Sequence, residues 1–381
     1  MDKSGRRCDN HAMKSYARTI AALLTATSAL AVGSPLAADD ATTFYRGLDL
    51  SYVNEVEDFG GEYREKGELV DPFELFARKG ANLVRARIWI DATWTKYSDL
   101  EDVKRTFARS RALDMDLLLA FHYSDTWADP KAQFIPQRWK TLSDRELVQA
   151  VYAYTKETLL ALDASGLMPE LVQIGNETNG GLLKRGKLVN EWNRDVALLN
   201  AGLRATREVA ALTGKPICTM IHIAQPQNAA WYFREAIKHG MTDFDIIGLS
   251  YYPQWSPLSP EGCGTEVASL RKEFKRDVLI VETAAPWTLD QLPETARGIL
   301  NQAVPGYKIN PEGQRDFLID LTRSVKKNGG LGVVYWEPAW VSSKMSTRWG
   351  QGSHWENATF FDFNNGNELL PAADFLSVAL D

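Results

Sequence analysis

The chain has 381 residues, of which 45% are hydrophobic and 24% are charged. This is ordinary globular composition, and the length suffices for one large domain with a substantial core. The formal net charge is −6, and no basic stripe is present. We therefore expect no binding to nucleic acid or to a membrane surface, and a neutral substrate suits the chain better.

The N-terminus has the pattern of a leader peptide. Lys14 and Arg18 precede an apolar, Ala-rich run over 19–32, and small residues suited to signal peptidase follow. We expect residues 1–38 to be a signal peptide and residues 39–381 to form a single catalytic domain. The apolar run is too short for a membrane anchor and nothing later resembles one, so a secreted or periplasmic product is expected.

Cysteine usage does not indicate a metal site. Cys8 lies in the expected leader, which leaves Cys218 in an apparent strand and Cys263 in an apparent loop. These two could pair in an oxidising compartment, but two unpaired thiols are the favoured interpretation. No spacing typical of structural zinc appears, so no zinc is expected.

The tryptophans have an unusual distribution. All twelve follow the expected leader, and many stand beside Pro, Gly or Asp rather than within periodic apolar runs. Burial in the core is the alternative interpretation for any one of them. So many loop tryptophans favour flat stacking platforms, which sugars use because their axial C–H faces pack on aromatic rings.

Apolar runs and helical spacing alternate along the first half of the chain. One expected helix begins with Ser143, followed three residues later by Glu146, which is a capping box. The segment from 51 to about 70 is polar and glycine-bearing, and it reads as a loop. Strands are expected over 44–51, 82–89, 115–121 and 171–174, and helices over 73–79, 99–113 and 143–162.

The second half continues the alternation. Strands are expected over 217–221, 244–250, 277–283 and 330–337, and helices over 192–212 and 231–239. Eight strands alternating with helical segments across roughly 330 residues are typical of an α/β fold, the (β/α)₈ TIM barrel. No internal repeat, low-complexity tract or linker interrupts the pattern, which predicts a single domain.

Each expected strand ends in a polar or aromatic residue. In a TIM barrel these ends converge on one face, so residues far apart in the sequence would line one cleft. A salt bridge to a barrel arginine is the ordinary interpretation of one isolated strand-end glutamate, but two of them among these neighbours favour catalysis. The strand-end residues are Asp49, Arg87, His122, Asn176 with Glu177, His222, Tyr251, Glu282 and Trp336.

Glu177 and Glu282 fit the paired carboxylates of glycoside hydrolysis. A retaining enzyme holds its acid/base and its nucleophile roughly 5 to 5.5 Å apart, because a covalent glycosyl-enzyme leaves no room for an intervening water. Their surroundings must push the two pKa values apart. We expect Arg87 and Tyr251 to keep Glu282 ionised, and Asn176 to bond the sugar 2-hydroxyl.

Six segments carry a resemblance to a known family. They are 45–51 (YRGLDLS), 84–89 (VRARIW), 121–130 (FHYSDTWADP), 174–177 (IGNE), 281–283 (VET) and 335–340 (YWEPAW). Together they resemble the arabinogalactan endo-β-1,4-galactanases of glycoside hydrolase family 53, within a large clan of retaining (β/α)₈ glycosidases. The segments span nearly the whole mature chain. Those of the third and eighth strands are long and specific, whereas the Asn-Glu pair alone would be weak.

The resemblance implies a retaining enzyme that cleaves internal bonds of (arabino)galactan side chains of pectin by double displacement. Glu177 would be the acid/base and Glu282 the nucleophile. The partner would be the polysaccharide β-1,4-galactan, and a monomer is expected. The substrate-binding residues would be Asp49, Arg87, Trp89, His122, Asp125, Trp127, Asn176, His222, Tyr251, Tyr252, Trp336 and Trp340.

The chain departs from the family pattern in two places. Bacterial members often carry calcium in the loops after strands seven and eight, but the loop after Glu282 lacks an oxygen cluster. We expect no cofactor and no metal, although Asp290, His354 and Asn357 could still contribute calcium ligands. The second departure is Tyr52, which follows Ser51 where the family often has a small polar residue, and which would narrow a distal subsite.

Other interpretations remain open at this stage. A xylanase or mannanase of the same clan would share the catalytic pair, and a non-catalytic galactan-binding protein would keep the aromatic platforms. His122 and His222 could be a metal pair, but they lack a third clustered ligand, so hydrogen bonding is favoured. Glu337 could be a third carboxylate near the cleft, but a structural partner for an arginine is favoured.

Overall fold

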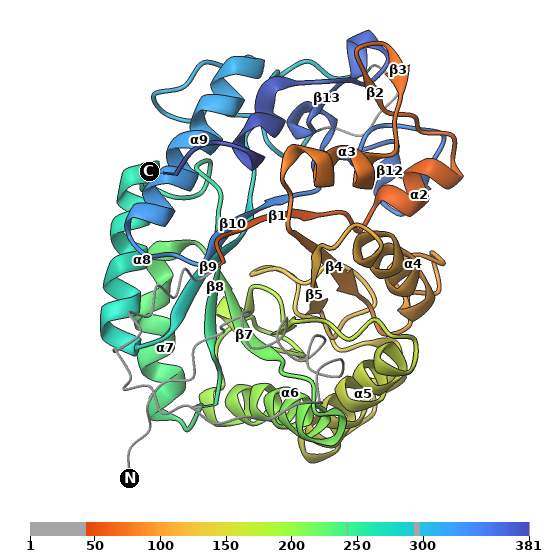
Figure 1. The fold of residues 1–381 in the computed structure, drawn as a ribbon. Helices are drawn as coiled ribbons and strands as arrows, with labels where there is room; N and C mark the ends of the chain where they lie inside the picture. Colours follow the sequence, from red (N-terminus) through yellow and green to blue (C-terminus); the bar gives the residue numbers. More distant parts are fainter. Residues whose placement is uncertain (1–42, 242, 293–297, 381) are drawn as a thin grey trace, which may run out of the picture.

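The computed structural model describes residues 43–241, 243–292 and 298–380, so the expected signal peptide over 1–38 lies outside the described part. Within these residues, eight parallel strands close into a barrel in the order β1-β10-β9-β8-β7-β6-β5-β4, and helices surround it (Figure 1). The predicted TIM barrel is confirmed. The barrel strands are β1 (Tyr45–Asp49), β4 (Leu83–Ile88), β5 (Asp116–Phe121), β6 (Leu171–Ile174), β7 (Cys218–Ala224), β8 (Ile246–Tyr251), β9 (Asp277–Thr283) and β10 (Gly332–Trp336).

Several helices begin or end at residues that cap them. Ser143 and Glu146 form the predicted capping box at the start of α5. Gly214 ends α6 in the left-handed conformation at φ 68°, which glycine adopts without steric cost. Two helices, α8 (Pro260–Phe274) and α9 (Pro311–Lys327), are not among the helices expected from the sequence. The helices that follow barrel strands are α3 (Pro72–Lys79), α4 (Leu100–Arg111), α5 (Asp144–Ala164), α6 (Trp192–Thr213), α7 (Ala229–Lys238), α8 (Pro260–Phe274) and α9 (Pro311–Lys327).

The prediction of a plain loop between 51 and about 70 is wrong. This segment contains the helix α2 (Val53–Asp58) and a small hairpin that pairs with strands near the C-terminus. Such pairing joins residues about 300 positions apart in the chain, so local sequence signals could not reveal it. The hairpin strands are β2 (Arg64–Glu65) and β3 (Glu68–Leu69). Strand β2 pairs with β14 (Glu368–Leu369), which pairs in turn with β13 (Phe361–Asp362).

Short elements fill the remaining loops of the described part. The hairpin β11 (Ser346–Thr347) and β12 (Gly350–Gln351) follows β10. Among the 3₁₀ turns, η3 directly follows Glu177. The 3₁₀ turns are η2 (Gln137–Trp139), η3 (Thr178–Gly180), η4 (Pro226–Asn228), η5 (Glu356–Ala358), η6 (Phe363–Asn365) and η7 (Pro371–Leu376).

The barrel interior changes from apolar to polar along its axis. Side chains such as Leu83, Met220 and Val281 form an apolar cluster separate from the core under the helices. Packing there is tight, because a Cβ on Gly248 would lie 2.6 Å from the Met220 sulfur. Two residues beyond Leu83 on the same strand face stands Arg85, which is fully buried. The apolar layer therefore supports a charged layer near the carboxyl ends of the strands.

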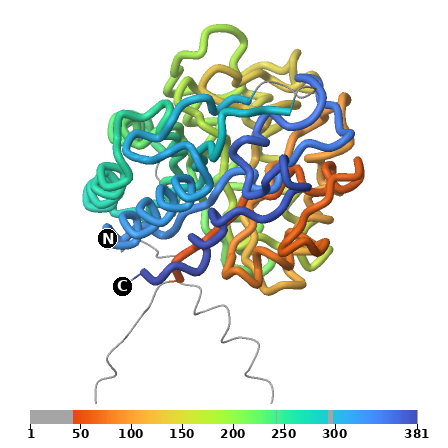
Figure 2. The backbone as a smooth tube through the Cα atoms, turned by 90° about the horizontal axis from the view of Figure 1, so that it is seen from above, coloured from red at the N-terminus to blue at the C-terminus, as the bar shows by residue number. Residues whose placement is uncertain are grey.

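The first strand and the end of the described chain lie side by side (Figure 2). The Arg46 guanidinium donates to the Val378 carbonyl at 2.8 Å.

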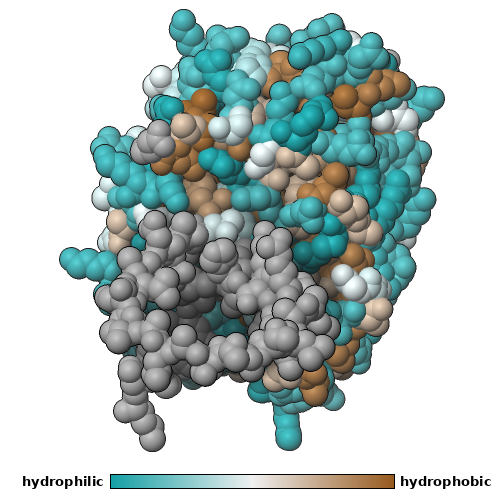
Figure 3. All heavy atoms as spheres, in the orientation of Figure 1, coloured by the Kyte–Doolittle hydropathy of each residue, from teal (hydrophilic) through white to brown (hydrophobic). Residues whose placement is uncertain are grey.

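The face in Figure 3 is largely hydrophilic, with apolar side chains scattered in small groups. In the described part, every helix is too short or too polar to cross a membrane.

The two cysteines beyond the expected leader do not bond to each other. Cys263 is a buried free thiol, as the favoured interpretation predicted, but it lies in α8 and not in the expected loop. Cys218, at the start of β7, is disulfide-bonded, so the expectation of an unpaired thiol is wrong there.

Candidate active site

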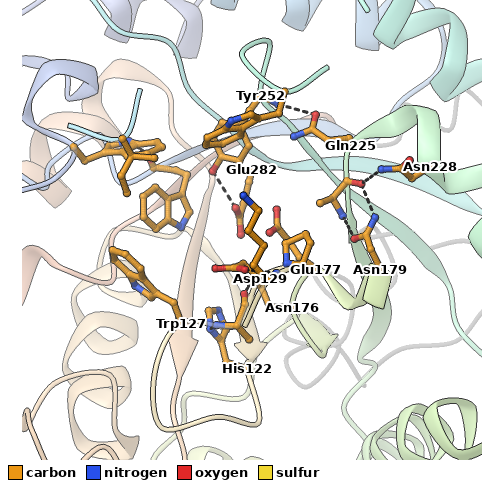
Figure 4. Close-up of a pocket in the computed structure, with 18 residues that line it drawn as sticks. His122, Trp127, Asp129, Asn176, Glu177, Asn179, Gln225, Asn228, Tyr252 and Glu282 are labelled. Carbon is orange, nitrogen blue, oxygen red and sulfur yellow. Dashed lines mark hydrogen bonds between the residues drawn. The ribbon is translucent and has the colours of Figure 1, made fainter. Parts of the chain in front are cut away.

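An open cleft of about 580 Å³ lies at the carboxyl ends of the barrel strands. This volume is in the range of sites for small ligands. Figure 4 shows Glu177 and Glu282 in the middle of the cleft, with Trp127 on one side and a row of amide side chains on the other. Of the predicted site residues, those that line the cleft are His122, Trp127, Asn176, Glu177, Tyr252, Glu282 and Trp336.

Glu282 points into the cleft because strand β9 is irregular beside it. Leu279 and Val281 both face the apolar barrel interior, so regular alternation would turn Glu282 outward. The pairing with β8 shifts register at this point, from Leu249 opposite Ile280 to Ser250 opposite Glu282. Such bulges re-aim a side chain and are common beside active sites.

The Glu282 carboxylate is held by two donors. Arg85 lies 2.8 Å from its Oε1 atom, and the Tyr252 hydroxyl donates to its Oε2 atom at 3.0 Å. The side chain is only 6% exposed. A buried carboxylate next to a guanidinium and a phenol is fixed in one orientation, as a nucleophile must be.

Glu177 reaches the cleft through an unusual backbone turn. Strand β6 ends at Ile174, and the chain then passes through Gly175 at φ 77° and Glu177 at φ 47°. Its Oε1 atom accepts from the Ser250 hydroxyl at 2.5 Å. Among the described residues, no lysine, arginine or histidine forms a salt bridge with Glu177, whereas Glu282 pairs with Arg85. Its electrostatic surroundings therefore differ from those of Glu282.

The two carboxyl groups lie close together across the cleft. The Ser250 Oγ atom is 2.5 Å from Glu177 Oε1 and 3.4 Å from Glu282 Oε2. The separation of those two oxygens therefore cannot exceed the sum of both distances, about 5.9 Å. Retaining glycosidases hold their carboxyl groups about 5 to 5.5 Å apart, and inverting ones about 6.5 to 9.5 Å. The upper bound lies below the range of the inverting enzymes, so the geometry favours the retaining class.

The surroundings separate the protonation behaviour of the two groups. Burial raises the pKa of Glu177, and the negative charge of Glu282 raises it further, to well above its ordinary value. Burial also raises the pKa of Glu282, but the Arg85 guanidinium opposes this effect. The neighbouring guanidinium makes Glu282 the carboxyl group that ionises more readily. The singly protonated cleft then carries an acid and an ionised carboxylate.

Arg85 organises the charged layer below the cleft. It lies 2.7 Å from Asp49, donates to Asn176 Oδ1 at 2.8 Å and also contacts Gln173 at 3.1 Å. Asn176 in turn donates from Nδ2 to the Ala128 carbonyl at 2.7 Å. One buried cation thus fixes Glu282 and the residue before Glu177.

The two histidines serve this network as hydrogen-bonding groups. His222 is fully buried, with Nδ1 2.9 Å from Asn176 Oδ1 and Nε2 2.9 Å from Ser250 Oγ. His122 accepts on Nδ1 from the Ala128 amide at 3.3 Å. Burial and the charge of Arg85 lower the pKa of both imidazoles well below the ordinary value, so both are neutral.

The expected contacts of Arg87 and Tyr251 with Glu282 are wrong. Arg87 lies 2.6 Å from Glu337, which gives Glu337 the structural role that had been favoured. The Tyr251 hydroxyl donates to the Leu258 carbonyl at 2.7 Å, away from the cleft. Arg85 and Tyr252 take their places. Arg85 and Arg87 share one face of their strand, and the depth of Arg85 in the barrel brings it to Glu282. Tyr251 and Tyr252 are adjacent, so their side chains point to opposite sides, and that of Tyr252 faces Glu282.

An aromatic wall closes one side of the cleft. Trp127, Trp336 and Trp355 line it, and Trp127 stacks on Trp349 with 4.2 Å between ring centroids. Behind this wall, Trp340 stacks on Tyr52 at 3.9 Å. Tyr52 is buried there and does not line the cleft, so the structure gives no support for its narrowing a distal subsite.

Several predicted binding residues lie beneath or behind the cleft surface. Asp49 accepts from Ser51 and pairs with Arg85. Trp89 is buried below the guanidinium of Arg87, and Asp125 accepts from the backbone amides of Asp91 and Gln137. These residues support the site rather than form its wall. The predicted residues that do not line the cleft are Asp49, Arg87, Trp89, Asp125, His222, Tyr251 and Trp340.

The sequence interpretation missed several residues of the site. The sequence shows Arg85 as an arginine inside an expected strand, but it does not show how deep in the barrel the side chain lies. Ser250 and Gln173 are single polar residues in two otherwise apolar strands, and nothing in the sequence around them indicates a role in a site. The amide row follows β6 and β7 in short loops whose shape the sequence does not specify. These missed cleft residues include Asn179, Gln225, Asn228, Trp255 and Trp355.

Of the residues considered for calcium, Asn357 uses its amide nitrogen in other contacts. Asn357 donates from Nδ2 to the carbonyls of Thr288 and Leu300. Within the described residues, no group of three or more His, Cys, Asp or Glu side chains could hold a metal ion. The expectation that the chain needs no cofactor stays a prediction.

Comparison with known proteins agrees with this geometry. The family model described as glycosyl hydrolase family 53 matches residues 45–376. An arabinogalactan endo-beta-1,4-galactanase of Cellvibrio japonicus is 51% identical over 92% of this chain and 95% of its own length. An endo-beta-1,4-galactanase of Bacillus subtilis is 31% identical over 78% of this chain and 70% of its own length. The solved GH53 catalytic domain of Ignisphaera aggregans superposes with a TM-score of 0.80 at 31% identity, covering 87% of this chain and 95% of that one.

Proposed function

Because the chain belongs to glycosyl hydrolase family 53, we propose that it is a retaining endo-β-1,4-galactanase that cleaves internal bonds of the galactan and arabinogalactan side chains of pectin. The polysaccharide would lie across the cleft, with its sugar faces on the aromatic wall. The names of the relatives support the substrate and the internal mode of cleavage. We extend the proposal to a monomer that is secreted or exported to the periplasm after removal of residues 1–38.

One observation carries the mechanism. Glu177 and Glu282 share a single hydroxyl, that of Ser250, at the middle of the cleft. In the described part of the chain, Glu282 pairs with a guanidinium and Glu177 does not. This asymmetry supports Glu177 as the protonated acid and Glu282 as the ionised nucleophile, since an adjacent cation favours the charged form.

In the first step, the Glu282 carboxylate attacks the anomeric carbon of the sugar bound at the aromatic wall. The bond from that carbon to the glycosidic oxygen breaks, and Glu177 gives its proton to the departing oxygen. The shortened chain leaves with a free hydroxyl group. The sugar remains joined to Glu282 as an ester, whose formation removes the negative charge that raised the Glu177 pKa.

In the second step, water attacks the same carbon from the opposite face of the ester. Glu177, now ionised, accepts a proton from the water, and the carbon–oxygen bond to Glu282 breaks. Two inversions give net retention of configuration. Both carboxyl groups return to their starting states.

A β-1,4-glycanase with another sugar preference is the second candidate, because the catalytic pair alone does not select galactose. A reducing-end assay on β-1,4-galactan, with xylan, mannan and carboxymethylcellulose beside it, separates the candidates. We expect rapid release of short oligosaccharides from galactan alone. Activity on another glycan would support the second candidate and make that glycan the substrate. Binding without hydrolysis would indicate a sugar-binding protein.

A further inference from the structure

Ser250 occupies a position that the two-carboxylate mechanism does not use. It lies on β8, is fully buried and does not line the cleft. Its Oγ atom is nevertheless within hydrogen-bonding distance of three groups: Glu177, Glu282 and His222. We propose that Ser250 is a positioning residue whose hydroxyl turns between His222 and Glu177 as Glu177 gains and loses its proton during a turnover.

The direction of the hydrogen bonds can be followed outward from Arg85. A guanidinium only donates, so the atom of Asn176 that faces it at 2.8 Å is the oxygen. His222 Nδ1 lies 2.9 Å from the same oxygen and must therefore carry a hydrogen. Because this imidazole is neutral, its Nε2 atom has a lone pair and no hydrogen. The positive charge at Arg85 thus fixes one tautomer of His222.

The tautomer leaves one hydrogen for two acceptors. Ser250 Oγ is 2.9 Å from the bare Nε2 of His222 and 2.5 Å from Oε1 of Glu177. A serine hydroxyl has a single hydrogen but can accept two bonds. It cannot donate to both neighbours at once. The protonation state of Glu177 decides which neighbour receives the hydrogen.

When Glu177 is ionised, the serine hydrogen goes to its carboxylate, because a charge-assisted bond is about twice as strong as a neutral one. When Glu177 is protonated, it can donate to Ser250 Oγ, which then turns its own hydrogen to His222. Glu177 therefore keeps a hydrogen bond in both charge states that it passes through. No covalent bond changes in this exchange, and no hydrogen leaves the site.

Other charged groups also affect the protonation of Glu177. Burial and Glu282 favour the protonated form, as does Asp129, while Arg85 and the Ser250 bond favour the ionised form. Ser250 provides the hydrogen bond to the Glu177 side chain that the structure shows. The titratable or charged groups around Glu177 are Arg85 on β4, His122, Asp129 and Lys131 after β5, His222 on β7, Tyr252 after β8 and Glu282 on β9.

The inference rests on the proposed function, since it gives Glu177 the acid/base role. The test is the pH dependence of kcat/KM on β-1,4-galactan for Ser250→Ala. Removing the hydroxyl harms the ionised form most, so we expect the alkaline limb to move up by about one pH unit. We expect kcat to fall about tenfold at the optimum while KM stays within about twofold, because Ser250 does not line the cleft.

Two further variants separate this role from a merely structural one. Ser110→Ala removes another fully buried hydroxyl, which donates to the Thr106 carbonyl at 2.8 Å in α4, and it should leave the pH profile unchanged. Ser250→Cys keeps a side chain of similar shape with a much weaker donor. It should shift the alkaline limb in the same direction, and it replaces the alanine variant should that protein fail to fold.

The outcomes distinguish the inference from the proposed function. An alkaline limb at the wild-type pH in a folded Ser250 variant, with kcat and KM changed together, would overturn the inference. Wild-type protein without activity on galactan, or full activity in Glu177→Ala, would instead overturn the proposed function. A shift confined to the Ser250 variants supports both.

Discussion

At the scale of single residues, the two glutamates differ in what surrounds them. Glu282 has a cation and a phenol within hydrogen-bonding distance, whereas Glu177 has one serine hydroxyl. In the proposed mechanism, these neighbours give the two carboxyl groups different tasks. Their separate roles lead to different expected effects of substitution.

Glu177→Ala should impair galactan hydrolysis far more than the cleavage of activated aryl galactosides. A good leaving group needs little protonation, whereas a sugar hydroxyl needs a general acid, which contributes about 10²- to 10⁴-fold. We expect kcat/KM to fall about 10³-fold on galactan and less than about tenfold on the aryl substrate. Steady-state kinetics on both substrates measure this, and equal losses would contradict the assignment of the acid.

Glu282→Ala should abolish turnover but not binding. The substitution removes the proposed nucleophile while the aromatic wall stays in place, so hydrolysis should fall by at least about 10⁴-fold. Calorimetry with a galacto-oligosaccharide should give a dissociation constant within about threefold of wild type. Turnover at the wild-type rate would remove Glu282 from the mechanism.

How far the sequence predicts these residues depends on the signal that each one leaves. Glu177 and Glu282 were recognised because an apolar strand stops at them. The choice of Arg87 over Arg85 failed because both arginines point inward from the same strand, and only their depth in the barrel differs. Tyr251 was chosen over Tyr252 because a buried parallel strand is apolar on both faces, which hides the alternation.

At the scale of elements, helix caps were the most reliable signals. The capping box at α5 and the glycine at the end of α6 depend on contacts within a few residues. The β2–β3 hairpin was missed because its stability comes from β14, far along the chain. Local chemistry could be predicted, and distant pairing could not.

Ser143→Ala tests the cap of α5. The serine side chain and Glu146 satisfy each other's backbone amides, and loss of such a cap costs about 1 kcal/mol. In a domain of this size we expect the midpoint of thermal unfolding to fall by about 1–2 °C. Ser165→Ala, at the exposed C-terminal end of the same helix, is the matched control and should change it less.

At the scale of the whole molecule, a buried ion pair connects two strands of the barrel that are not adjacent. Arg87 on β4 reaches Glu337, which directly follows β10, so the pair spans the intervening strand β1. Both side chains are buried, and Tyr52 packs against the guanidinium at 4.0 Å. This pair lies behind the aromatic wall and supports it.

Glu337→Ala should destabilise the fold strongly. It leaves Arg87 buried without its partner, which costs about 3–5 kcal/mol. Chemical denaturation should show this loss, and the double variant with Arg87→Met should recover part of it because the uncompensated charge is gone. Glu235→Ala, which removes an exposed ion pair with Lys238, is the control and should change stability by less than about 0.5 kcal/mol. A loss as small as that of the control would argue against a supporting role for the pair.

The irregularity beside Glu282 has a consequence for transplanting this chemistry. The register shift between β8 and β9 adds the one residue that turns the glutamate toward its partner. In a barrel with regular strands, a glutamate grafted at the equivalent depth would face the surrounding helices. A designer who moves this catalytic pair to another scaffold must therefore move the extra residue of backbone as well as the two side chains.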